Sequence, residues 1–217
     1  MDKIRKSIEL EKDKYGKIFV DISFAIDNVS PFIDKEILAR RKYSAKITTL
    51  KKYMELLESA ESELNTKKFF RKSKEDRYIF LLESYKNDHS ESLSQLEKCS
   101  NCECLNCTAN CKFDSCLGCK SSSNISYCDR EKINVTKHDD FSINLLNNRT
   151  GKNNRYTVLA TLQDVKLDRK YIIIENIKSK EKFILYYYPG ISEDSYGEIK
   201  DAQEFDFIVS TFQSVDK

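Results

Sequence analysis

The front of the chain repeats apolar side chains at the three- and four-residue steps of an amphipathic helix. The first series spans residues 3–29, where Gly16 costs the helix about 1 kcal/mol relative to alanine. Its apolar members are Ile4, Ile8, Tyr15, Ile18, Ile22, Ile26 and Val29. Ser30 and Pro31 mark a boundary, because serine caps helices and proline has no N–H for the first turn to leave unbonded.

A second series alternates steps of three and four, as the seam of a two-stranded coiled coil does. Its apolar members are Tyr43, Ile47, Leu50, Met54, Leu57 and Leu64. After a basic run, residues 73–76 resemble a capping box, and a third helix follows. The positions on one side of that helix are Tyr78, Leu82, Tyr85, His89 and Leu96. Residues 1–97 are therefore predicted to form a helical hairpin, bundle or short coiled coil.

Towards the other end of the chain the period changes to two, which is typical of β-strands. Phe141, Ile143 and Leu145 alternate with polar residues. Residues 147–154 have turn chemistry, and residues 156–162 have the pattern of a further strand.

Two β-branched and aromatic runs, residues 171–175 and 183–188, are separated by a polar stretch, which indicates a hairpin. Residues 201–204 form a capping box ahead of a terminal amphipathic helix. The apolar positions of that helix are Phe205, Ile208, Val209 and Phe212. Residues 139–217 are therefore predicted to form a small antiparallel sheet with a terminal helix, so the expected fold class is α+β.

The last third of the chain also shows a resemblance. The stretches that carry it are Val158–Thr161, Lys170–Ile174, Phe183–Tyr186, Ile199–Asp201 and Glu204–Asp206, with Phe212. In their order and residue types they resemble the YrzB-like family, small uncharacterised domains of low-GC Gram-positive bacteria. The acidic character of that family is weaker here, since lysines are frequent. The resemblance implies a small α+β domain of bacterial or phage origin, and it implies no reaction because the family has no established activity.

All eight cysteines of the chain lie in one segment between its two ends. They are Cys99, Cys102, Cys104, Cys107, Cys111, Cys116, Cys119 and Cys128. Three of the spacings are Cys-x2-Cys, in which a tight turn presents two thiolates to one tetrahedral ion. Clustered cysteines without a signal peptide favour a reducing cytoplasm and a metal over a disulfide framework. Residues 98–138 are therefore predicted to form a zinc module between domains 1–97 and 139–217.

Spacing leaves open how the cysteines divide among ions, and two closed four-thiolate zinc sites are the preferred interpretation. One partition joins Cys99, Cys102, Cys116 and Cys119 and leaves Cys104, Cys107, Cys111 and Cys128 for a second ion. Such sites would interlock, because each ion would close the loop of the other. A three-zinc cluster that also uses His138 is an alternative, and so is an iron–sulfur cluster, although ferredoxin spacing is absent.

The net charge of +2 gives little reason to expect nucleic-acid binding by bulk charge, since two zinc ions on eight thiolates leave the chain nearly neutral. One local exception combines cations with aromatic rings that could contact phosphates and stack on bases. It consists of Lys67, Lys68, Phe69, Phe70, Arg71 and Lys72. Arg40, Arg41 and Lys42 could extend this basic strip. The preferred interpretation is a solvated connection between helices.

The sequence contains few residues and no motif that would indicate an enzyme. It has two histidines, and it lacks a glycine-rich phosphate loop, a nucleophile elbow and a His-Glu-x-x-His motif. It also lacks a run of about 18 apolar residues that would span a membrane. We therefore expect a cytoplasmic, non-enzymatic zinc-binding adaptor that contacts a protein partner, with a homodimer as a further option. The alternatives are a zinc-dependent nucleic-acid-binding regulator or inhibitor of a nucleoprotein machine, and a metal buffer or redox sensor.

Overall fold

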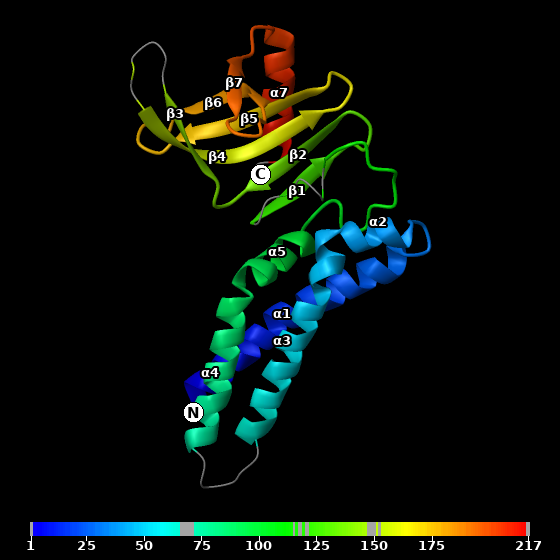
Figure 1. The fold of residues 1–217 in the computed structure, drawn as a ribbon, viewed down its shortest axis with the longest axis vertical. Helices are drawn as coiled ribbons and strands as arrows, with labels where there is room; N and C mark the ends of the chain where they lie inside the picture. The colour runs from blue at the N-terminus through cyan, green and yellow to red at the C-terminus, as the bar shows by residue number, and fades with distance from the viewer. Residues whose placement is uncertain are drawn as a thin grey trace. The chain divides into compact units, whose positions relative to one another are not determined.

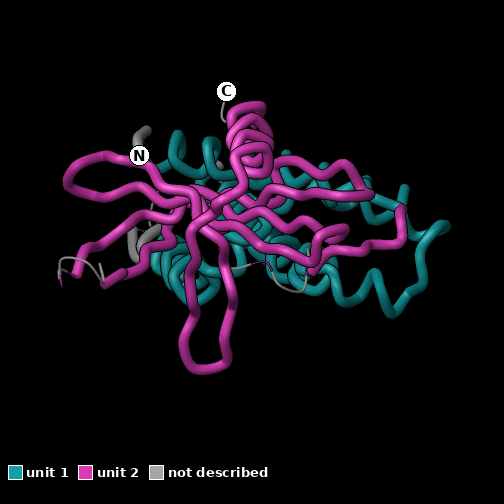
Figure 2. Tube along the Cα trace, turned by 90° about the horizontal axis from the view of Figure 1, so that it is seen from above, with its two compact units in different colours: residues 1–108 teal, residues 109–217 magenta. Residues whose placement is uncertain are grey.

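The computed structural model of the chain describes residues 2–65, 72–114, 116, 119, 122–146, 151 and 153–215. The chain forms two compact units, Met1–Thr108 and Ala109–Lys217, which are coloured separately in Figure 2. The first unit is helical, whereas the second is an antiparallel sheet with a terminal helix (Figure 1), which confirms the α+β fold class. The boundary between the units lies inside the cysteine-rich segment. The division into three domains stays a prediction.

The described helices of the first unit follow the apolar periodicity of the sequence. They are α1 (Asp2–Val29), α2 (Lys35–Arg40), α3 (Lys42–Asn65), α4 (Lys72–Asp88) and α5 (Ser90–Ser100). Helix α3 packs against α1, α4 and α5, so its apolar positions serve a bundle core. The side chains of Ile22, Leu50 and Leu96 have no exposed surface in that core.

The third predicted helix is divided into two. Helix α4 ends at Asp88 and α5 begins at Ser90, with His89 between them in a non-helical conformation (φ −115°, ψ 15°). The imidazole of His89 lies against the ring of Tyr85, with 4.3 Å between the ring centroids. His89 thus packs at a helix junction. The side chains of the predicted capping box, residues 73–76, lie outside the described part of the chain, as do residues 67–71 of the basic run.

The second unit is built on one antiparallel sheet. Its described strands are β1 (Ser123–Cys128), β2 (Ile133–His138), β3 (Ser142–Leu146), β4 (Asn153–Asp164), β5 (Arg169–Asn176), β6 (Lys182–Tyr188) and β7 (Ser195–Glu198). The order across the sheet is β1-β2-β4-β5-β6-β7, and β3 pairs with the first part of β4. The strands predicted from the period-two pattern, β3 to β6, are all present.

The sheet begins earlier in the chain than the sequence pattern indicates. Strands β1 and β2 lie within residues 98–138, the segment expected to be a separate module. Strand β1 pairs with β2, which pairs with β4. Cys128 is the last residue of β1 and lies opposite Asn134. The last part of the cysteine-rich segment is therefore a piece of the sheet.

Helix α7 (Ala202–Val215) covers one face of the sheet (Figure 1). Side chains alternate along β5, so Ile173 packs with Ile208 of α7 whereas Ile172 and Ile174 face the opposite side. The predicted N-cap is present, because Asp201 Oδ1 accepts a hydrogen bond of 2.9 Å from the N–H of Glu204.

The side chain of Glu204 ties α7 to strands β5 and β6. Its carboxylate accepts hydrogen bonds from the hydroxyls of Tyr171 (2.6 Å) and Tyr186 (2.9 Å) and pairs with Arg169 Nη1 at 2.5 Å. Burial disfavours the ionised carboxylate, but these hydrogen bonds outweigh burial and lower the pKa of Glu204. Burial and the hydrogen bond to Glu204 raise the pKa of Tyr171. Glu204 is therefore a charged clamp rather than a capping-box partner of Asp201.

Candidate metal centre

The first four cysteines follow one another at the end of α5, and each Cys-x2-Cys pair closes a turn. The N–H of Cys102 donates to the carbonyl oxygen of Cys99 at 3.1 Å, and the N–H of Cys107 donates to that of Cys104 at 3.3 Å. Between these turns, the N–H of Leu105 donates to the carbonyl oxygen of Cys102 at 2.9 Å. Hydrogen bonds three residues apart bring the first and fourth Cα atoms close together. The backbone therefore has the shape that paired metal thiolates require.

Two side chains from the helices hold this loop in place. Arg41, between α2 and α3, donates from Nη1 to the carbonyl oxygen of Cys104 at 3.3 Å and from Nη2 to that of Cys107 at 2.6 Å. The hydroxyl of Tyr43 accepts from Arg41 Nη1 and donates to the carbonyl oxygen of Leu105 at 3.2 Å. Leu105 itself is buried in the helical core. The loop is thus fixed to the first unit at three carbonyls.

Arg41 has a different role from the one that the sequence indicates. In the sequence it belongs to a run of cations that could extend a basic surface, but in the structure only 9% of it is exposed. Its hydrogen-bond partners are more than 60 residues away in the chain, so a local sequence pattern could not have predicted them. A guanidinium beside this loop brings positive charge close to the cysteines, where thiolates would be negative.

Cys99 is the first cysteine of the loop, and its side chain lies in the helical core. It is buried, and so is Gln95, one turn earlier in α5. The side-chain amide Nε2 of Gln95 lies 3.5 Å from Cys99 Sγ, within reach of an N–H to sulfur hydrogen bond. Amide donors to sulfur are the usual outer partners of thiolate ligands. Sequence reasoning did not single out Gln95, and it placed Arg41 only in a possible basic strip.

The last four cysteines belong to the second unit. Cys111 is exposed, and its Sγ lies 3.5 Å from the carbonyl oxygen of Phe113. Cys119 Sγ lies 3.2 Å from the carbonyl oxygen of Ser123 and 3.1 Å from its hydroxyl. Cys116 and Cys128 are half-buried. The last of the four, Cys128, ends strand β1.

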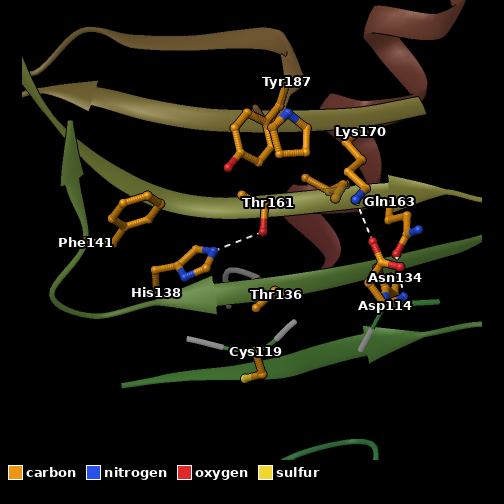
Figure 3. A pocket seen from close by; sticks show the side chains of 12 residues that line it. Asp114, Cys119, Asn134, Thr136, His138, Phe141, Thr161, Gln163, Lys170 and Tyr187 are labelled. Carbon is orange, nitrogen blue, oxygen red and sulfur yellow. Dashed lines mark hydrogen bonds and ion pairs between the residues drawn. The ribbon is translucent and has the colours of Figure 1, made fainter. Parts of the chain in front are cut away.

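Asp114 fastens this part of the segment to the sheet. Its backbone N–H donates to Gln163 Oε1 of β4 at 3.0 Å, and its carboxylate pairs with Lys170 Nζ of β5 at 2.5 Å. Figure 3 shows Asp114 near Gln163 and its ion pair with Lys170. Phe113, the preceding residue, is buried. The second set of cysteines is therefore attached to the sheet, as the first set is attached to the helices.

A cavity of about 190 Å³ lies beside this attachment, lined by Cys119, His138, Thr161, Lys170 and Tyr187 among others. His138 ends β2, and its Nε2 lies 3.0 Å from Thr161 Oγ1, as Figure 3 shows. Burial, followed by the hydrogen bond to Asp194, raises the pKa of Tyr187. The hydroxyl of Tyr187 donates to Asp194 Oδ2 at 3.0 Å. That His138 is a metal ligand stays a prediction.

The eight cysteines are all described, and each is a thiol rather than half of a disulfide. Among the described residues, no three Cys, His, Asp or Glu side chains lie close enough together to hold a metal ion. The backbone turns and the donor chemistry fit zinc, whereas the positions of the sulfur atoms are not those of a loaded site. Metal binding would therefore have to turn the thiols towards a common centre, which couples binding to local folding.

The predicted nucleic-acid contacts are not tested by the structure. The candidate nucleic-acid residues 67–71 are outside the described part of the chain, and so is the side chain of Lys72.

None of the described helices combines the length and the apolar character needed to cross a membrane.

Comparison with known proteins identifies no relative of this chain. No family model matches the chain, and no curated protein and no solved structure is significantly similar to it. The resemblance of its last third to the YrzB-like family therefore stays a prediction.

Proposed function

We propose that this protein is a non-enzymatic, zinc-binding interaction protein that contacts a protein partner through its helical unit. The observation that carries the proposal is a set of large apolar side chains left exposed on the outer side of α1. They are Leu10, Val20 and Phe24, whose exposed fractions are 60%, 63% and 66%. At 100° per residue these three positions share one side of the helix. Exposed apolar side chains gathered on one face are typical of interaction surfaces.

Further large apolar side chains are exposed just beyond the end of α1. Phe32 is 73% exposed in the connection to α2, and Ile37 of α2 is 45% exposed. The buried side of α1 is already complete, because Ile22 and Ala25 have no exposed surface. Val20 and Phe24 are therefore not needed for the core, and burying them against a partner would stabilise a complex by roughly 1.5–3 kcal/mol each.

The proposed role of zinc is structural. Four thiolates complete the coordination of a zinc ion, so no position remains for substrate or water. The thiols of the cysteine-rich segment and its closed Cys-x2-Cys turns support this role. Zinc would then order a segment that holds few large apolar residues of its own.

Capture experiments with matched variants test the proposed surface. The full chain, Phe24→Asp and Phe80→Asp would be immobilised at equal density and exposed to lysate, and bound proteins and nucleic acids would be quantified. Phe80 is the control, because it is a phenylalanine with 68% exposure on α4. We expect Phe24→Asp to lose one defined protein at least tenfold, while Phe80→Asp retains it. Equal capture by all three chains would contradict the proposed surface, and capture of nucleic acid alone would favour the nucleic-acid-binding alternative.

A further inference from the structure

The two compact units divide the eight cysteines into consecutive sets of four. The unit boundary lies between Thr108 and Ala109, so Cys99, Cys102, Cys104 and Cys107 belong to the helical unit. Cys111, Cys116, Cys119 and Cys128 belong to the unit with the sheet. An interlocked pair of sites would have to take thiolates from both units for each ion. Each set has the four donors that a structural zinc ion requires.

We propose that Cys99, Cys102, Cys104 and Cys107 bind one zinc ion entirely within the helical unit, without any of the four later cysteines. This inference rests on the proposed zinc binding and assigns the ligands of one site. Both ligand pairs already have closed turns, with hydrogen bonds of 3.1 Å and 3.3 Å from the second cysteine's N–H to the first cysteine's carbonyl oxygen. The two turns are adjacent, so one ion can close them together.

The surroundings of this loop also fit a four-thiolate zinc ion, whose net charge is about −2. Arg41 is 9% exposed and donates to the carbonyls of Cys104 and Cys107, which places its positive charge next to two of the ligands. Gln95 offers an amide N–H to the sulfur of Cys99. A buried cation and a buried amide at one four-cysteine loop are a suitable environment for negative sulfur.

Binding at this loop proceeds by exchange of protons for the metal. Each of the four thiols releases its proton to solvent as its sulfur binds, so affinity rises with pH. The hydrogen bonds to Arg41 and Tyr43 use backbone carbonyl oxygens of the loop and not its sulfur atoms. Cys99 provides a fixed starting point, because it is buried in the last turn of α5.

Native mass spectrometry of zinc-loaded, reduced full-length chains distinguishes the two partitions. Cys102→Ser with Cys107→Ser removes ligands from one site here, but from both sites of the interlocked arrangement. Cys111→Ser with Cys116→Ser does the same for the second set. Cys102→Ser with Cys116→Ser has the opposite effect, because it damages both sites here and only one interlocked site. We expect two ions in the wild type, one in each of the first two variants and none in the third.

The decisive result does not depend on the wild-type count. The ion assigned to the helical unit must survive Cys111→Ser with Cys116→Ser and be lost on Cys102→Ser with Cys107→Ser. Failure of either condition overturns this partition and leaves zinc binding itself standing. A wild-type chain that binds no ion overturns the partition and the proposed zinc binding together. Circular dichroism of each variant shows whether its helices remain folded, and the cobalt(II) spectrum gives an independent count of thiolate ligands.

Discussion

The guanidinium of Arg41 lies 2.6 Å from the carbonyl oxygen of Cys107, measured from its Nη2. This hydrogen bond connects the junction of α2 and α3 with the end of the first four-cysteine loop, across 66 positions of the chain. It is accompanied by a second bond to the carbonyl of Cys104 and by a third to the hydroxyl of Tyr43. One buried side chain therefore fixes the loop that we assign as a zinc ligand set.

Replacement of Arg41 should destabilise the helical unit and weaken zinc binding. Arg41→Gln removes the charge and shortens the side chain, so the carbonyls of Cys104 and Cys107 lose their donors. Hydrogen bonds from a charged donor contribute about 1.5–3 kcal/mol, and we expect a comparable loss in the free energy of unfolding measured in urea. Arg40→Gln is the matched control, because Arg40 is exposed on α2. Equal stability and equal zinc affinity of the two variants would contradict the role of Arg41.

The core of the bundle should depend on residues that the apolar periodicity identifies. Leu50 of α3 is fully buried in the helical core. Leu50→Ala should lower the free energy of unfolding by about 2–5 kcal/mol, because it removes buried methyl groups and leaves a cavity. Leu10→Ala makes the same chemical change at a residue that is 60% exposed, and it should change the stability little. Urea denaturation of the two variants makes this comparison, and similar losses in both would contradict the described core.

Local pattern was sufficient for α1, because its buried positions Ile8, Tyr15, Ile18, Ile22 and Val29 fall on one side of a helix of period 3.6. It was insufficient for the junction at His89, since no proline or glycine marks the break between α4 and α5. Strand β1 was missed because its six residues are mostly polar and its pairing with β2 depends on distant β4. The role of Arg41 was missed for a related reason, because its partners are set by tertiary packing.

The clamp at Glu204 should make the stability of the second unit depend on pH. Burial opposes ionisation of Glu204, but its hydrogen bonds from Tyr171, Arg169 and Tyr186 lower its pKa in the folded protein. Ionised Glu204 therefore favours the folded state at neutral pH. This contribution is lost as the pH falls through the lowered folded-state pKa, below the ordinary value of about 4.3.

Thermal unfolding between neutral pH and pH 3 tests this dependence in a Glu204→Gln variant. We expect the variant to melt below the wild type at pH 7, with a difference that shrinks as Glu204 becomes protonated in the wild type. Glu193→Gln is the control, since Glu193 lies exposed near β7 and should follow the wild type throughout. A constant difference between wild type and Glu204→Gln at every pH would contradict the clamp.

Removal of zinc should loosen the cysteine loops while the two cores persist. The helical core around Leu50 and the sheet core around Ile173 consist of buried apolar side chains that need no metal. The loop from Cys102 to Cys107 is joined to its unit by hydrogen bonds from Arg41 and Tyr43 and by one buried side chain, Leu105, so it gains more from an ion than either core does. Hydrogen exchange with and without a chelator should therefore show faster exchange in this loop and little change in α3 and β5. Unfolding of both cores at the same chelator concentration would show that the folding of both units depends on the metal. Unchanged hydrogen exchange in the loop would contradict metal binding there.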